Sequence, residues 1–195
     1  MNIAVLILAA GMSSRMGQLK ALLLIERETV IERLVSVFRQ NDVKVFIVTG
    51  YGSQDIVQAL KNQEVTVVEN PKYELGMFTS VQAGVRALQP AIEAFFVMPV
   101  DIPLVKSETI KSLINEHHKN PSKIIYPVFG GTRGHPPLIP GNLVPVIMQW
   151  SKDGNLRDVL NSYSNLAVEL EVNDRGILLD IDTLDDYESL LKSLD

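Results

Sequence analysis

Apolar residues recur along the first half of the chain in short continuous runs, separated by segments with apolar positions at helical spacing. The continuous runs predict strands at residues 3–8, 43–48, 65–68 and 94–98. The segments that predict helices are residues 30–39, 53–60 and 79–88. Alternation of strand and helix is typical of an α/β domain with a mostly parallel sheet. Strands that are apolar at every position also fit a sheet covered by helices on both faces.

The second half of the chain follows a less regular pattern. A helix is expected at residues 107–118 with Ser107 as its N-cap, and Pro127 in the next apolar run predicts an edge or terminal strand. The remaining elements expected are short helices at 142–150 and 155–163, strands at 167–172 and 177–181, and a final helix capped by Thr183. Without a break in composition, we expect one domain over residues 1–195, with a small C-terminal lid region.

Composition and charge exclude several classes of function. The hydrophobic content of 46% and charged content of 21% are ordinary for a soluble globular protein. A formal net charge of −5 without a basic block argues against a nucleic-acid partner. The absence of cysteine excludes thiol catalysis, disulfides and thiolate metal sites. The first apolar run is short and lacks a preceding basic region, so we expect no membrane partner and a cytoplasmic location.

The loop after the first strand has the composition of a polyphosphate site. Its small residues let backbone N–H groups approach an anion, and Arg15 and Lys20 would neutralise phosphate charge. The residues expected to bind a nucleotide here are Leu8, Ala9, Ala10, Gly11, Arg15 and Lys20.

The spacing of this loop differs from the two common phosphate-binding motifs. Five residues separate Gly11 from Gly17, whereas a Walker A loop has four between its glycines. A dinucleotide-binding fold needs an acidic residue near the end of its second strand, and here that strand ends in Thr49 and Gly50. The alternative interpretation is an ordinary strand-to-helix turn with solvated charges.

Two carboxylates are candidate metal ligands. Asp101 follows the strand at 94–98 and lies between Pro99 and Pro103, at the edge of the sheet where ligands of open parallel sheets bind. Asp182 is the expected second ligand, and Asp180 would share its face if this segment is a strand. Mg²⁺ commonly takes one or two protein carboxylates together with substrate phosphates. The alternative for both residues is a capping role at a turn or helix.

Other polar residues indicate where the two substrates would bind. Asn70 begins the loop after the third strand, and Ser80 near the start of the next helix would contact a nucleobase or ribose, unless it is simply a buried helix serine. Arg133, His135 and Arg157 are the candidates for binding an anionic acceptor, although His135, next to two prolines, also fits a structural role.

Six segments together resemble a known family. The chain contains, in this order, LAAGMSSRMGQLKALL, NPKYELGMFTSVQAG, MPVDIPLV, GTRGHP, SKDGNLRDVL and LLDIDTLDDYESL. This series resembles the MobA/MocA-like nucleotidyltransferases, and within them the molybdenum cofactor cytidylyltransferases and xanthine dehydrogenase accessory proteins. The first segment is shared with sugar-phosphate nucleotidyltransferases, whereas its combination with MPVDIP, RGHP and DIDT is more specific.

The resemblance implies a Rossmann-like nucleotidyltransferase fold that binds CTP or GTP and Mg²⁺. The family's loop motif falls on Gly11, Arg15 and Lys20. Its metal positions fall on Asp101 and Asp182, and its base-contacting serine on Ser80. Guanylyltransferases of the family carry Ala-Gly-Gly where this chain has Ala-Ala-Gly at 9–11, which favours CTP.

The implied activity is transfer of CMP from CTP to the phosphate of a molybdopterin-type acceptor, with Arg15, Lys20 and Asp101 as catalytic residues. The product would serve a partner enzyme, a molybdenum hydroxylase of the xanthine dehydrogenase type. Three alternatives remain open: a GTP-using guanylyltransferase, a sugar- or polyol-phosphate nucleotidyltransferase, and a non-catalytic chaperone of the molybdenum cofactor.

Overall fold

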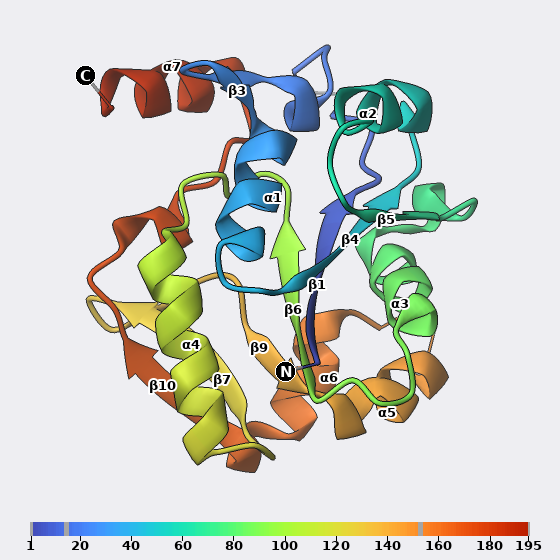
Figure 1. Ribbon diagram of the computed structural model, residues 1–195, viewed down its shortest axis with the longest axis vertical. Helices are drawn as coiled ribbons and strands as arrows, with labels where there is room; N and C mark the ends of the chain where they lie inside the picture. The colour runs from blue at the N-terminus through green and yellow to red at the C-terminus, as the bar shows by residue number, and fades with distance from the viewer. Residues whose placement is uncertain (1, 14–15, 152–153, 195) are drawn as a thin grey trace.

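An eight-stranded, mostly parallel sheet runs through the molecule (Figure 1). The computed structural model describes residues 2–13, 16–151 and 154–194. The strands of this sheet are β1 (Ile3–Ala9), β4 (Lys44–Thr49), β5 (Thr66–Glu69), β6 (Ala94–Pro99), β7 (Ile124–Phe129), β8 (Thr132–Arg133), β9 (Leu138–Pro140) and β10 (Ala167–Glu171). Their spatial order is β10-β7-β9-β6-β1-β4-β5, and β8 pairs with β7.

Strand β1 lies inside the sheet, and all seven of its residues are buried. It runs parallel to β4 on one side and to β6 on the other, with Val5 opposite both Val45 and Phe96. Parallel strands end at the same edge of a sheet. The loop after β1 and the turn after β6 therefore begin side by side.

Helices cover both faces of the sheet, as the continuous apolar strands predict. The helices are α1 (Val30–Arg39), α2 (Ser53–Ala59), α3 (Met77–Ala87), α4 (Ser107–Lys119), α5 (Val144–Gln149), α6 (Leu156–Ser162) and α7 (Leu184–Lys192). Side chains of α1 and α4 share one core with Val5 and Ile7 of β1. Side chains of α3, α5 and α6 share the other core with Leu6 and Leu8 (Figure 1). Among the described helices, none combines the length and apolar character needed to cross a bilayer.

The strand expected at residues 177–181 is wrong. The chain forms a short 3-10 helix, η5 (Arg175–Leu178), and continues as an irregular segment toward α7. The side chains of Ile177 and Ile181 are both buried, and the backbone N–H of Ile181 donates to the carbonyl of Asp101 at 2.8 Å. The apolar residues here anchor a loop to the sheet edge and do not pair as a strand.

Pro127 does not mark an edge strand, which corrects a second expectation. Strand β7 lies between β10 and β9, and the outer strand on this side is β10. On its other side β7 pairs with β9 at Ile125 and with β8 from Val128 onward. Pro127 falls between these two pairings, where its missing N–H removes no bond from the ladder, and its carbonyl accepts from Gly134 at 2.9 Å. Strands β7, β9 and β10 belong to the central sheet, so much of the region expected to form a lid is part of that sheet.

Helix α4 is capped by a residue far away in the sequence, and not by Ser107. The helix begins at Ser107, and the N-cap position is Lys106, whose side chain makes no cap bond. The carboxylate of Asp174, which is 1% exposed, accepts from the backbone of Lys106 at 2.8 Å and from the hydroxyl of Thr109 at 2.7 Å. It also accepts from the backbone of Gly176 at 3.0 Å. In contrast, Thr183 caps α7 as expected, in a capping box with Asp186.

Replacing Asp174 tests this long-range cap. Asp174→Ala leaves buried donors on α4 and η5 without an acceptor, and we expect the free energy of unfolding in urea to fall by about 2–3 kcal/mol. Glu108→Ala is the matched control, because Glu108 is an exposed acid in the first turn of the same helix. Its effect should stay within about 0.5 kcal/mol. Equal losses in the two variants would show that Asp174 acts only as a nearby negative charge.

Candidate active site

A lysine and two aspartates from distant parts of the chain meet at the carboxyl edge of the sheet. Lys20 begins the 3-10 helix η1 (Lys20–Leu22), Asp101 follows β6, and Asp182 precedes α7. The Nζ atom of Lys20 lies 2.7 Å from Oδ1 of Asp182 and 3.6 Å from Oδ2 of Asp101. The structure therefore brings together three residues that the sequence assigned to one site.

Backbone contacts hold each member of this cluster in place. The hydroxyl of Ser13 accepts from the backbone N–H of Lys20 at 3.1 Å, and Ser13 itself adopts a left-handed conformation with φ of 48°. The carbonyl of Asp101 accepts from Ile181, the residue directly before Asp182. Sequence reasoning missed Ser13, because a serine in a small-residue loop gives no signal of the donor that it will meet.

Burial sets the electrostatics of Asp101. Removal from water raises the pKa of its carboxyl above the usual range, the Lys20 ammonium opposes this shift, and the neighbouring Asp182 carboxylate adds to it. Such a pair of carboxylates is stabilised by a cation between them. Two carboxylates are also a suitable donor set for a divalent ion that takes its other ligands from a bound phosphate. Within the described residues no group of three or more His, Cys, Asp or Glu side chains could hold a metal ion, so substrate oxygens or water would have to complete the coordination.

A cavity of about 600 Å³ opens beside Asp101. It lies between the carboxyl ends of the central strands and the helices α3 and α6. The polar residues around it are Asp101, Tyr126, Arg133, His135, Asn155, Arg157, Asn161 and Asp180, and the apolar ones include Leu8, Phe78, Val81 and Leu160. All three residues expected to bind the acceptor thus line one cavity together with an expected metal ligand. Asp180, the neighbour of the second ligand, faces this cavity too.

Arg133 is held in a fixed orientation at the cavity wall. Its guanidinium lies 4.4 Å from the centre of the Tyr126 ring, and its Nε donates to Glu169 at 2.6 Å. Part of its charge is therefore compensated within the fold. Tyr126, absent from the sequence-based site, lines the cavity and also contacts Arg133 through its ring face.

His135 contributes a neutral ring. Burial, with the nearby Arg157 guanidinium adding to it, lowers the pKa of His135 below its usual value, so the imidazole is uncharged at neutral pH. Its Nδ1 atom is buried without a hydrogen-bond partner among the described residues. Against an anionic acceptor, Arg157 would supply positive charge.

The backbone at Gly134 and His135 is pressed against the segment that leads to Asp182. The N–H of His135 donates to the carbonyl of Ile177 at 3.0 Å. A Cβ atom on Gly134 would lie only 2.5 Å from that same oxygen. A glycine is therefore required where these two backbones meet.

The first loop provides the expected small-residue surface. Leu8, Ala9 and Ala10 are buried, and the carbonyl of Ala10 accepts from the backbone of Tyr51 at 3.3 Å. Gly11 is exposed, and no atom lies within 4 Å of the point where its Cβ would be. An approaching phosphate would find open space there. Arg15, the other predicted cation, lies outside the described residues.

Asn70 and Ser80 form a buried pair. Each is 3% exposed, and the side-chain amide of Asn70 donates to the hydroxyl of Ser80 at 2.9 Å and to that of Thr79 at 2.8 Å. This pair fastens the loop after β5 to the start of α3. The geometry matches the alternative of a buried helix serine, which the sequence left open.

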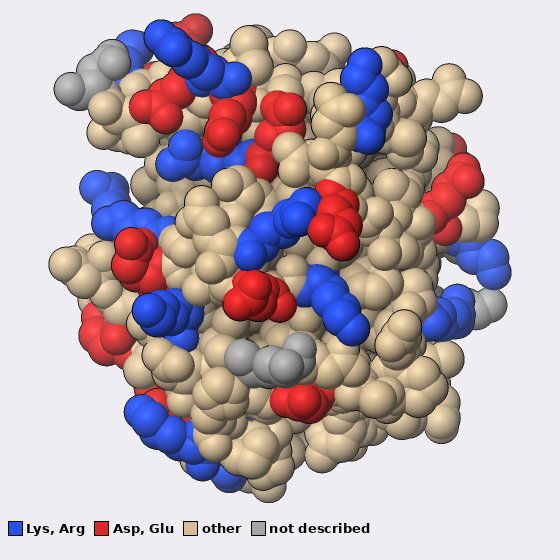
Figure 2. Space-filling model, viewed as in Figure 1, with Lys and Arg blue, Asp and Glu red and all other residues tan. Residues whose placement is uncertain are grey.

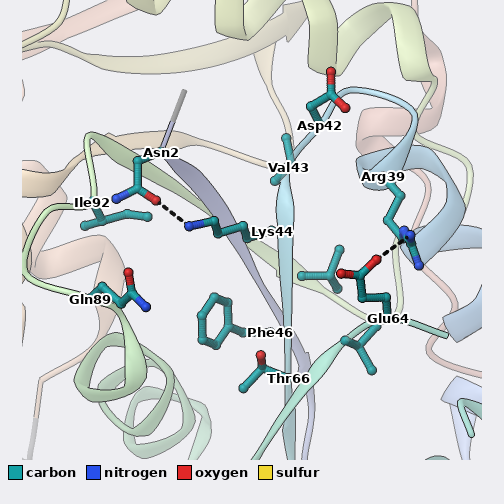
Figure 3. A pocket seen from close by; sticks show the side chains of 12 residues that line it. Asn2, Arg39, Asp42, Val43, Lys44, Phe46, Glu64, Thr66, Gln89 and Ile92 are labelled. Carbon is teal, nitrogen blue, oxygen red and sulfur yellow. Dashed lines mark hydrogen bonds and ion pairs between the residues drawn. The ribbon is translucent and has the colours of Figure 1, made fainter.

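Two further features of the surface are the distribution of charge and a second cavity outside the candidate site. Figure 2 shows acidic and basic side chains interspersed over one face, without a broad basic surface there. A cavity of about 490 Å³ lies at the opposite, amino-terminal edge of β4 and β5 (Figure 3). Two cations in its lining already have partners: Lys44 donates to Asn2 at 3.0 Å and Arg39 to Glu64 at 2.9 Å. None of the predicted site residues that the structure describes lines it.

Comparison with known proteins identifies the family. Residues 5–167 match the model of the MobA-like NTP transferase domain. The molybdenum cofactor cytidylyltransferase of Escherichia coli K12 is 32% identical over 183 residues, which cover 93% of this chain and 92% of that protein.

Solved structures show the same fold. Rv0371c from Mycobacterium tuberculosis H37Rv superimposes with a TM-score of 0.84 at 23% identity and 98% coverage of both chains. A structure of Rv0371c in complex with manganese gives a TM-score of 0.81 at 24% identity, over 99% of this chain and 100% of that one. A nucleotidyl transferase from Methanothermobacter has a TM-score of 0.81 at 22% identity, with 98% and 96% coverage. Because the family model spans most of the chain and the E. coli relative aligns over nearly its full length, the chain belongs to the MobA-like NTP transferases and is a nucleotidyltransferase.

Proposed function

We propose that the protein transfers CMP from CTP to the phosphate of a molybdopterin-type acceptor and releases pyrophosphate. The observation that carries this proposal is the cluster of Lys20, Asp101 and Asp182 at the mouth of a cavity that also presents Arg157 and His135. The similarity to a molybdenum cofactor cytidylyltransferase supports the choice of both substrates. The product would then serve the maturation of a molybdenum hydroxylase of the xanthine dehydrogenase type.

The chain's residues would perform the transfer mainly by positioning and by stabilising charge. An oxygen of the acceptor phosphate attacks the α-phosphorus of CTP, the bond from that phosphorus to the bridging oxygen breaks, and pyrophosphate leaves. A phosphate is already anionic near neutral pH, so the attack needs no general base. Lys20 would stabilise the charge that develops on the α-phosphate, while Arg157 would hold the acceptor.

Asp101 and Asp182 are the residues that would hold Mg²⁺. A bound divalent cation supplies stabilisation of phosphoryl charge without proton transfer. The manganese complex of the structural neighbour supports a divalent ion in this fold. The backbone N–H groups around Ala10 and Gly11 would face the phosphates of the nucleotide.

Asp101→Asn should lower the rate of transfer by at least about 10²-fold, because the variant loses one charged ligand oxygen. The fold should persist, since the bond to Ile181 uses the backbone carbonyl of Asp101. Pyrophosphate release from CTP, Mg²⁺ and molybdopterin measures the effect. Asp185→Asn, an exposed acid in the first turn of α7, is the matched control. Wild-type turnover in Asp101→Asn with normal Mg²⁺ dependence would contradict the metal assignment.

Lys20→Ala should reduce kcat by about 10²–10³-fold, because its cation acts where charge develops in the transition state. The acceptor KM should change much less, since Lys20 does not line the acceptor cavity. Steady-state kinetics with varied acceptor separates the two effects. An unchanged kcat would leave Lys20 as a counter-ion with no part in the transfer.

The nucleobase preference depends on Ala10. We expect its methyl group to leave less room for a purine than a glycine would, and one such contact is worth roughly 1–3 kcal/mol. We therefore expect CTP to be preferred over GTP by about 10–200-fold in kcat/KM, and Ala10→Gly to reduce this ratio. The ratio does not depend on the amount of active protein. Equal values, or a preference for GTP in the wild type, would overturn the choice of cytosine.

A further inference from the structure

Lys20 occupies the place where a cation must sit to contact both carboxylates. Its ammonium lies 2.7 Å from one oxygen of Asp182 and 3.6 Å from one oxygen of Asp101, and its side chain is only 14% exposed. The carboxylates of Asp182 and Asp180 both raise the pKa of Asp101, which shows that negative charges crowd this corner of the site. Lys20 is therefore a counter-ion built into the chain.

A divalent ion at Asp101 and Asp182 and the ammonium in this position would compete for the same oxygens. Mg²⁺ binds carboxylate oxygens at about 2.0–2.1 Å, so the two cations would be neighbours and would repel each other. The backbone of Lys20 is fixed by the bond from its N–H to Ser13 and by its place at the start of η1. Its four-carbon stem carries the ammonium and can change rotamer while the backbone stays in place.

We propose that Lys20 is an exchangeable counter-ion that makes metal binding depend on the nucleotide. A triphosphate bound to the first loop offers the ammonium a new anionic partner, and the ammonium then leaves the position between the two carboxylates that the divalent ion would take. The inference rests on the proposed function, in which these carboxylates hold the metal. Metal and nucleotide then bind with positive coupling, and each raises the affinity of the other by the same factor.

The test measures Mn²⁺ binding by titration calorimetry, with electron paramagnetic resonance of free Mn²⁺ as an independent readout. Without nucleotide, Lys20→Met should bind Mn²⁺ about tenfold more tightly than the wild type, because the competing charge is gone. Lys61→Met removes an exposed lysine beyond α2 and should match the wild type. With a non-hydrolysable CTP analogue, the Mn²⁺ affinity of the wild type should rise at least about tenfold, and that of Lys20→Met much less.

Two further variants separate the possible outcomes. Lys20→Arg keeps the positive charge and should bind Mn²⁺ as weakly as the wild type, so tight binding by this variant would overturn competition by charge. Mn²⁺ affinity in Lys20→Met that is equal to or weaker than that of the wild type would overturn the proposal as well. Asp101→Asn tests the metal site itself. If it keeps full Mn²⁺ affinity beside the CTP analogue, the proposed function fails at its metal ligands. If it loses Mn²⁺ while Lys20→Met shows no gain, only the exchange proposed here fails.

Discussion

The site depends on the parallel alignment of β1 between β4 and β6. Because β1 is buried along its whole length, its register against both neighbours is set by core packing on two faces. That register places the start of the first loop beside the turn that carries Asp101. No contact within either loop would be enough to bring Lys20 and Asp101 together. The alignment of the strands in the sheet brings the two loops together.

Much of the fold could be predicted because its strongest signals are local. A continuous apolar strand such as β1 and a helix with regular spacing such as α1 are each visible within a few residues. Strand β9 could not be found in this way, because three residues carry no period and it is defined only by its pairing with β6 and β7. The strand expected around Ile177 and Ile181 was predicted wrongly for the opposite reason. Its apolar residues have the spacing of a strand, while its peptide groups bond to a turn and to Asp101.

The candidate site, like the fold, could be predicted only in part from the sequence. Residues next to the ends of elements, such as Lys20, Asp101 and Asp182, could be identified from their position and charge. What each one touches could not, because the partners are up to 162 positions away. The buried pair of Asn70 and Ser80 shows the difference clearly. Both residues have types and positions typical of a nucleotide site, yet the side chain of Asn70 donates to Ser80 and Thr79 within the fold.

The close passage of Gly134 against Ile177 couples two backbone segments that lead to different parts of the candidate site. One of these backbones leads directly into His135, which lines the cavity beside Asp101, and the other runs on to Asp180 and Asp182. Neither can shift far without pushing the other. A protein engineer who wished to retarget the enzyme could vary the side chains that line the cavity, such as Leu160. Transplanting a whole acceptor loop from another enzyme would fail unless its backbone kept a glycine at this crossing.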